Sequence, residues 1–305
     1  MYLHDDVVAF RDLNRATAEH LGIRQAFVYK DYYTCMILKE VTAANPAFVF
    51  KGGTALSKCY RAISRFSEDI DLGLDDARPT EAARKNTKKA VQFATKKLGL
   101  EIGNIDETRS RREFNQYRTS LPKVIPDVLD DDMIIVETGL MTPASPSILG
   151  KAMSFIGEYL LSIGAEDILS LYGLERFSLK VVSVERAFAD KAFALADYYL
   201  NGDIPKRQSR HIYDLYKLEQ ALTLDAKMND LFKRVRSERR GNLKCSSAAQ
   251  GVSLAGVLQE IYDKQAYRHD YEAVTVPLLY EEVDYLTAVS VIPKIVGFLL
   301  KSDSL

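Results

Sequence analysis

Two glycines and two carboxylates stand close together in the first quarter of the chain. Gly52 and Gly53 are adjacent, and Asp69 and Asp71 are separated by one residue. A glycine pair lets backbone N–H groups approach a phosphate. The N-terminus of a helix that follows the pair also favours a bound anion. Two neighbouring carboxylates repel each other unless a cation lies between them, and Mg²⁺ prefers carboxylates together with substrate phosphates. The combination predicts metal-assisted phosphoryl or nucleotidyl transfer.

The surrounding pattern predicts a strand, a turn, a helix and a second strand, which would position these groups. Residues 47–50 are apolar and predict a short buried strand, and the glycines form the turn after it. Thr54 is the expected N-cap of the helix, whose apolar residues recur at helical spacing. Residues 69–74 alternate, so the two aspartates share one face of a strand and the apolar side chains share the other.

The rest of the chain predicts an α+β fold with two parts. The first part contains N-terminal helices, a basic helix and further strands of the same sheet, and from Glu185 the pattern is helical almost throughout. We therefore expect a mixed α/β domain over residues 1–184 and an all-helical domain over residues 185–305. The further elements that the pattern predicts are a helix over 84–98 and strands over 114–118, 133–137 and 179–184.

Each feature of the first motif has a simpler explanation when it is taken alone. A glycine pair is usually a turn, and an Asp-x-Asp pair is usually the solvated face of a strand. A haloacid-type phosphatase needs a long apolar strand directly before its first aspartate, but Arg65-Phe-Ser-Glu precedes Asp69 here. A Walker A loop is excluded because the sequence lacks GxxxxGK[ST]. The coupling of both features through one helix favours the catalytic interpretation.

The segment KGGTALSKCY…RFSEDIDLGL resembles the signature of the AbiEii/AbiGii-type nucleotidyltransferase toxins, in the DNA polymerase β-like superfamily. Members include MenT-type toxins that modify tRNA acceptor ends. The segment SVERAFADKAFAL, with Lys191, matches a second motif, and RHIYDLYKL, with Asp214, matches a third. His211 departs from the pattern, because many relatives have an aspartate there. The resemblance implies a nucleotidyltransferase-type mixed sheet with flanking helices, followed by the all-helical domain.

The resemblance also implies roles for individual residues of the first motif. Asp69 and Asp71 would bind Mg²⁺ or Mn²⁺, and Glu137 is the candidate third ligand, with a solvated acid at a strand end as the alternative. Arg65 would contact the nucleotide phosphates, or else pair with a carboxylate of its own loop. The full set of residues expected to bind the NTP is Gly52, Gly53, Thr54, Lys58, Arg65 and Ser67.

The second and third motifs each supply one charged residue to the predicted site. Lys191 lies on an apolar helix, and its ammonium would point at the triphosphate. The alternative is a surface lysine whose ammonium extends into water. Asp214 would orient Lys191 or accept the proton of the acceptor hydroxyl. Its simpler role is an ion pair with Arg210, one helical turn earlier.

Charge and composition limit the partners. The chain has 305 residues, with 41 basic and 42 acidic side chains. The basic residues are nevertheless concentrated: residues 84–97 hold six and no acid, and residues 233–244 hold six and one acid. Such segments suit RNA phosphates, although a solvated helix face explains many of them. Cys35, Cys59 and Cys245 are too scattered for a disulfide framework or a zinc site.

The sequence predicts a cytoplasmic protein without a membrane segment. The N-terminus carries acids where a signal peptide has an apolar core, and no run approaches the ~18 apolar residues of a membrane span. We expect a Mg²⁺-dependent toxin that transfers NMP from an NTP to RNA, with the tRNA 3′ end as acceptor and an antitoxin as a further partner. The alternatives are transfer to a protein hydroxyl and a nucleotide-binding module without turnover.

Overall fold

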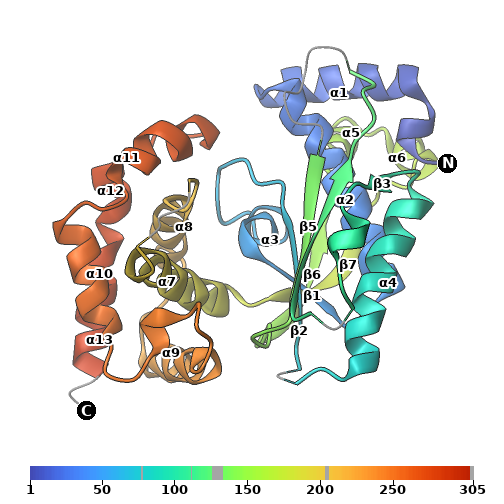
Figure 1. Ribbon diagram of the computed structural model, residues 1–305. Helices are drawn as coiled ribbons and strands as arrows, with labels where there is room; N and C mark the ends of the chain where they lie inside the picture. The colour runs from blue at the N-terminus through green and yellow to red at the C-terminus, as the bar shows by residue number, and fades with distance from the viewer. Residues whose placement is uncertain (77, 111, 126–132, 203–205, 303–305) are drawn as a thin grey trace. The chain divides into compact units, whose positions relative to one another are not determined.

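The computed structural model divides into two compact units. The first unit comprises Met1–Tyr60 and Ser67–Val182, and the second comprises Arg61–Phe66 and Ser183–Leu305. The first unit contains the sheet, and the second contains α7–α13 (Figure 1). The residues that the structure describes are 1–76, 78–110, 112–125, 133–202 and 206–302.

The first unit is built on a seven-stranded mixed sheet, which confirms the predicted fold class. The strand order is β3-β4-β5-β2-β1-β7-β6. The pairs β1–β7 and β2–β5 are parallel, and the other neighbouring strands are antiparallel. The strands are β1 (Phe48–Lys51), β2 (Ile70–Leu74), β3 (Glu101–Ile102), β4 (Phe114–Ser120), β5 (Met133–Gly139), β6 (Ser147–Ala152) and β7 (Phe177–Val182).

One long helix forms the centre of this unit's core. α2 is buried along nearly its whole length and packs against α1, α4, α5 and the sheet. In Figure 1, α2 and α4 lie on one side of the sheet. Ile70, Leu72 and Leu74 of β2 belong to the same apolar core, as their alternation predicts. The helices are α1 (Val7–Leu21), α2 (Gln25–Ala44), α3 (Gly52–Lys58), α4 (Glu81–Lys97), α5 (Phe155–Ser162) and α6 (Glu166–Leu171).

Two local predictions differ from the structure. Thr54 is not the N-cap of α3, because the helix begins at Gly52 and Lys51 is its N-cap. The Thr54 side chain is instead buried and lies 2.9 Å from the Ser67 hydroxyl. The second difference is β6, an edge strand that is missing from the strands predicted from the sequence. β6 exposes Ile148 and Leu149, so it lacks the alternation of burial that identifies a strand in sequence.

The described residues of the second unit are mainly helical, and a short antiparallel bridge joins Arg65 and Leu279. Arg61–Phe66 lies between α3 and β2 in sequence, yet its backbone pairs with residues 278–280 of this unit. Ser64 O accepts from Tyr280 N at 2.9 Å, and Phe66 N donates to Leu278 O at 2.8 Å. The unit's longer helices are α7 (Val184–Leu200), α8 (Arg210–Glu219), α9 (Ala226–Arg239), α10 (Leu254–Asp263) and α13 (Val291–Ser302), with α11 (Arg268–Asp270) and α12 (Tyr285–Val289) as short turns.

α7 is the central helix of the second unit. It packs against α8, α9 and α10, and α10 packs against α13. Phe188 and Phe193 of α7 contact Phe232 of α9 edge-on or tilted. Across the described residues of both units, none of the helices combines the length and the apolar character that crossing a bilayer requires.

Candidate active site

A row of polar side chains crosses the sheet of the first unit. Lys51 of β1 is the register partner of Asp71 on β2, and Asp71 is the partner of Glu137 on β5. Glu137 is in turn the partner of Gln116 on β4. Directly opposed residues on neighbouring strands project from the same face of a sheet. We call this face, with Asp69 directly before β2, the acid face.

Asp71 lies directly against the glycine turn. Gly52 has a φ of +78°, a conformation that residues with a side chain rarely adopt. A Cβ on Gly52 would stand 1.9 Å from Asp71 Oδ2 and 2.8 Å from Asp71 Cγ, which no side chain could occupy. Position 52 therefore requires glycine for two reasons, its backbone angle and the carboxylate beside it.

Asp69 and Glu137, the other two predicted metal ligands, are not shown in direct contact with the glycine turn. Asp69 and Asp71 are both half-buried, whereas Ile70 between them is fully buried. Glu137 Oε1 accepts a hydrogen bond from Gln116 Nε2 at 3.0 Å, which fixes the carboxylate on the sheet. In the described part of the chain, no three His, Cys, Asp or Glu side chains gather closely enough to hold a metal ion. The predicted set of three ligands is thus not assembled.

The residues predicted to bind nucleotide have differing surroundings. Gly53 follows Gly52 in the turn, and Thr54 and Ser67 bond to each other through their hydroxyls. Lys58 is buried and pairs with Asp31, and its ammonium also lies 3.5 Å from the centre of the Phe155 ring. Burial lowers the pKa of Lys58, but the Asp31 carboxylate outweighs that effect and raises it. The Lys58 charge is therefore directed into the core of the first unit.

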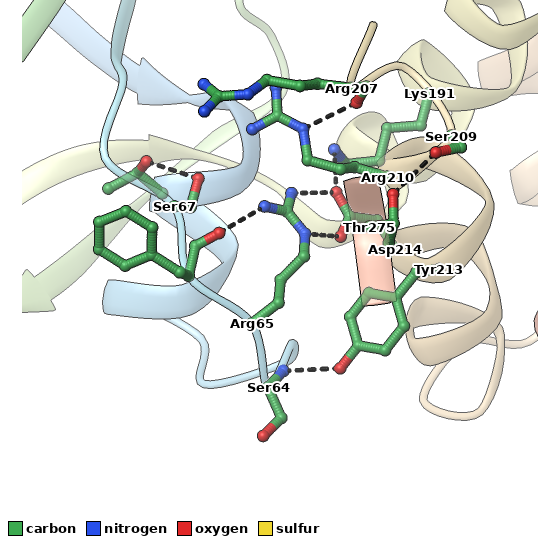
Figure 2. Close-up of polar contacts among 12 residues, drawn as sticks. Ser64, Arg65, Ser67, Lys191, Arg207, Ser209, Arg210, Tyr213, Asp214 and Thr275 are labelled. Carbon is green, nitrogen blue, oxygen red and sulfur yellow. Dashed lines mark hydrogen bonds and ion pairs between the residues drawn. The ribbon is translucent and has the colours of Figure 1, made fainter. Parts of the chain in front are cut away.

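In the second unit, one buried carboxylate holds two cations (Figure 2). Arg65 donates from Nε to Asp214 Oδ1 and from Nη2 to Asp214 Oδ2, each at 2.7 Å. Lys191 Nζ donates to Asp214 Oδ2 at 2.6 Å. Asp214 is 0% exposed, and Arg65 and Lys191 are buried with it. We call these three residues the Asp214 cluster.

The contacts of the Asp214 cluster bear on the roles and the partner predicted for Asp214. Burial raises the pKa of Asp214, but Arg65 and Lys191 outweigh that effect and hold it well below its usual range. Because both of its oxygens already accept from cations, Asp214 is not suited to accept the proton of an acceptor hydroxyl. Its partners are Lys191 and Arg65 instead of Arg210, which donates to the Arg207 carbonyl at 2.8 Å.

Arg65 has a carboxylate partner on α8, far from its own loop in sequence, and the surface interpretation of Lys191 is wrong. Arg65 Nη1 also donates to the Phe66 carbonyl at 3.0 Å. Lys191 is only 6% exposed, so it does not extend its head into water. Burial, together with the neighbouring Arg65 and Arg210 charges, lowers the pKa of Lys191 despite the opposing effect of Asp214.

His211 lies beside the Asp214 cluster on α8. Burial and the Lys191 charge lower its pKa well below the ordinary value, so the imidazole is neutral. Its ring stacks on Tyr198 with an interplanar angle of 10°. A neutral ring adds no charge beside the Asp214 cluster.

The two basic segments differ in how much of their charge is available. In α4 the lysines 85, 89 and 96 are exposed. In the segment 233–244, however, Arg239 pairs with Asp197 at 2.6 Å and Arg234 with Glu238 at 2.8 Å. Arg236 donates to the carbonyl of Val252. Much of the second segment therefore stabilises its own unit, which the sequence alone did not indicate.

Two residues of the acid face, Lys51 and Gln116, were not among the predicted site residues. Lys51 ends β1 beside Asp71, one residue beyond the strand that the apolar pattern of residues 47–50 predicts. Its position directly before the glycine pair was the available signal. Gln116 was placed on a strand, but nothing in the sequence indicated that it would be the register partner of Glu137.

Comparisons with known proteins agree with this arrangement. The chain resembles the structure of MenT4, a nucleotidyltransferase toxin from Mycobacterium tuberculosis H37Rv, with a TM-score of 0.52 and 19% sequence identity. The likeness covers 94% of this chain and 89% of MenT4, and it supports the fold. No curated protein matches the chain.

Residues 37–292 match the family model described as the nucleotidyl transferase AbiEii toxin of type IV toxin–antitoxin systems. This range includes the glycine turn, the acid face and the Asp214 cluster. The chain belongs to the AbiEii family of nucleotidyltransferase toxins.

Proposed function

We propose that this nucleotidyltransferase moves NMP from an NTP to a hydroxyl of an RNA acceptor in a reaction that requires Mg²⁺ or Mn²⁺. The acceptor hydroxyl loses its proton to solvent and its oxygen forms a bond to the α-phosphorus. The bond from that phosphorus to the β-phosphate oxygen breaks, and pyrophosphate leaves. The observation that carries the proposal is the position of the Asp71 carboxylate directly against the Gly52 turn, on the acid face.

The donor chemistry of the acid face fits a hard divalent cation. Mg²⁺ is usually held by one or two carboxylates together with substrate phosphates, so a preassembled set of three ligands is not required. Asp69 and Asp71 would hold the ion, and Glu137, fixed by Gln116, lies beside Asp71 on the next strand. When bound, the metal would offset negative charge on the triphosphate and on the leaving pyrophosphate.

The Asp214 cluster supplies the second part of the proposal. It contains two cations and one carboxylate, so it keeps one net positive charge in a buried setting. A cation in such a setting interacts strongly with an anionic ligand because little water screens it. We assign Lys191 to the triphosphate, with Asp214 as its positioning residue and Arg65 as the residue that holds Asp214.

An RNA acceptor is favoured over a protein by the surface of α4. A groove of 410 Å³ there is lined by Ala44, Asn45, Asn86, Lys89, Ala90 and Phe93. Phe93 is 56% exposed between the exposed lysines 89 and 96. An exposed aromatic ring among cations suits unpaired RNA, whose bases stack while its phosphates pair with lysine.

The tRNA 3′ end is the acceptor that the resemblance to MenT-type toxins suggests, because it is single-stranded and ends in a free hydroxyl. The proposal also places the enzyme in the cytoplasm, where NTPs and tRNA are both present, and gives it a cognate antitoxin as partner.

Transfer of label tests this proposal. The protein is incubated with each α-³²P-labelled NTP, Mg²⁺, total tRNA and cell lysate. The variant Asp71→Asn removes one carboxylate of the acid face, and Glu101→Gln makes the same change in charge at an exposed position on β3 of the same sheet. We expect label on tRNA with the wild type and Glu101→Gln, and none with Asp71→Asn.

The other outcomes are equally informative. Label on protein in place of tRNA would support the alternative acceptor, a protein hydroxyl. Equal label with Asp71→Asn and the wild type would overturn the assignment of the acid face. NTP binding without any transfer would contradict the proposed reaction and favour a binding module.

A further inference from the structure

Lys51 is a cation on the acid face to which neither the motifs nor the proposed function assigns a role. It is the last residue of β1, and its register partner is Asp71. The side chain is half-buried, unlike the exposed lysines of α4. Its position places a positive charge on the same face of the sheet as Asp71 and Glu137.

Two glycines make room for this side chain. Gly73 and Gly139 are two residues beyond Asp71 and Glu137 along the same strands, so they lie on the same face. A Cβ on Gly73 would stand 3.7 Å from Lys51 Cε, and a Cβ on Gly139 would stand 3.2 Å from Lys51 Nζ. Lys51 therefore extends across Gly73 and ends over Gly139, where even a methyl group would crowd the ammonium.

Among the residues that the structure describes, none pairs with the charge of Lys51. Lys58 pairs with Asp31, and Lys30 lies 2.8 Å from Glu68, so two nearby lysines have carboxylate partners. The Lys51 ammonium makes no hydrogen bond or ion pair with any residue that the structure describes. A partly buried ammonium loses hydration without gaining a partner, and an anionic ligand would offset that cost.

We propose that Lys51 contacts the triphosphate of the NTP substrate. The inference rests on the proposed function, because it assumes that the NTP lies on the acid face. An NTP with one bound Mg²⁺ is still an anion, and Lys51 is a half-buried cation on the face that carries the metal ligands. A small ligand reaches such a position more readily than the backbone of a folded RNA, so the NTP is the source of the phosphate.

Steady-state kinetics of lysine variants tests the role of Lys51. Lys51→Met removes the charge and keeps the length, and Lys51→Arg keeps the charge. Lys151→Met is the matched control, an exposed lysine on the edge strand β6. Loss of one charged contact predicts a KM for the NTP about 10-fold higher in Lys51→Met. The KM for the acceptor and the melting temperature stay at wild-type values, Lys51→Arg shows a smaller change, and the control shows none.

Competition by shorter nucleotides locates the contact. NTP, NDP and NMP of the preferred base are compared as inhibitors or ligands of the wild type and of Lys51→Met. The loss of affinity in the variant is greatest for NTP and least for NMP. A loss that is equal for all three, or an increase only in the acceptor KM, would overturn the proposal and point to another part of the nucleotide or to the RNA.

A double-mutant cycle with Gly139 tests whether the effect of this glycine on NTP binding depends on Lys51. Gly139→Ala places a methyl group 3.2 Å from the Lys51 ammonium and raises the KM for the NTP in the wild-type background. In the Lys51→Met background it has no further effect, because coupled residues are not additive. Equal effects in both backgrounds would show that Gly139 does not act through Lys51.

The failure of this inference is distinct from the failure of the proposed function. If Asp71→Asn abolishes transfer and Lys51→Met leaves the KM for the NTP unchanged, the reaction stands and Lys51 has no role in binding. If Asp71→Asn transfers label as well as the wild type, the acid face is not the site, and the proposal for Lys51 falls with it.

Discussion

Two aspartates in matching family motifs have opposite surroundings. Asp71 is half-buried on the acid face against a glycine turn, where the sheet presents a second carboxylate beside it. Asp214 is fully buried, and three hydrogen bonds from Arg65 and Lys191 satisfy its two oxygens. The first arrangement suits binding of an additional cation, and the second suits the positioning of a cation already present.

The comparison shows that a motif specifies a residue type but not its role. A carboxylate that is paired in the interior contributes to stability through the charges it neutralises, and its removal leaves those charges buried. A carboxylate at the surface of a site contributes to function at little cost in stability. We therefore expect a variant of Asp71 to lose mainly activity and a variant of Asp214 to lose mainly stability.

The largest expected effect is on turnover in Asp71→Asn. Loss of a group that stabilises charge in the transition state lowers the rate by up to about 1,000-fold. The melting temperature should remain close to that of the wild type, because the amide has nearly the same shape as the carboxylate. Label transfer under single-turnover conditions and thermal unfolding measure the two effects; a large fall in melting temperature would make the two aspartates alike.

Asp214→Asn should instead destabilise the second unit. The substitution leaves the Arg65 and Lys191 cations buried without their carboxylate, which costs about 3–5 kcal/mol. Denaturant unfolding measures the change. A loss of activity with unchanged stability would contradict the structural part of the comparison and would make Asp214 a residue that acts on substrate.

Lys191→Met should cost less stability than Asp214→Asn. The Arg65 bond to Asp214 survives, so only one charged hydrogen bond is lost, worth about 1.5–3 kcal/mol. Turnover should still fall, since the variant lacks the cation assigned to the triphosphate. The same two assays apply to this variant. Wild-type turnover in a folded Lys191→Met would remove the lysine from the proposed mechanism.

Glu137→Gln should have a smaller effect on turnover, about 10-fold. Glu137 is not gathered with the aspartates into one group of ligands, and the Gln116 amide holds it from the neighbouring strand. The dependence of the rate on Mg²⁺ concentration checks this expectation. A loss as large as that of Asp71→Asn would make Glu137 a full metal ligand.

The smallest expected effect is a dependence of stability on pH. The pKa of Asp214 is depressed in the folded state, so its contribution is full above the unfolded value and is lost as the pH falls. The free energy of unfolding of the wild type should decrease as the pH falls below about 4. Denaturant titrations of Asp214→Asn should lack this component, and identical slopes would show that Asp214 is not the group responsible.

Sequence alone could predict the part of the acid face around Asp71 because that part is local. The glycine turn, one short helix and the strand with Asp71 are contiguous, and the apolar alternation of residues 70–74 fixes which face carries the carboxylate. The strands 114–118 and 133–137 were also predictable. Their pairing order in the sheet was not, so the row from Lys51 to Gln116 emerged only from the structure.

The Asp214 cluster lay beyond prediction from sequence because it is long-range. Arg65 and Asp214 are 149 positions apart, and their bond depends on the short segment 61–66 joining the second unit by backbone pairing. A pattern of residue types predicted that Lys191 and Asp214 matter. It gave no means to predict that Arg65 would be the second partner of that aspartate.

The most direct test of the account is the position of a bound metal. Crystals grown with Mn²⁺ and a non-hydrolysable NTP analogue should give an anomalous peak within coordination distance of Asp69 and Asp71, beside Gly52. An anomalous peak elsewhere on the protein would contradict the account. So would a structure in which the analogue binds without metal and away from the acid face.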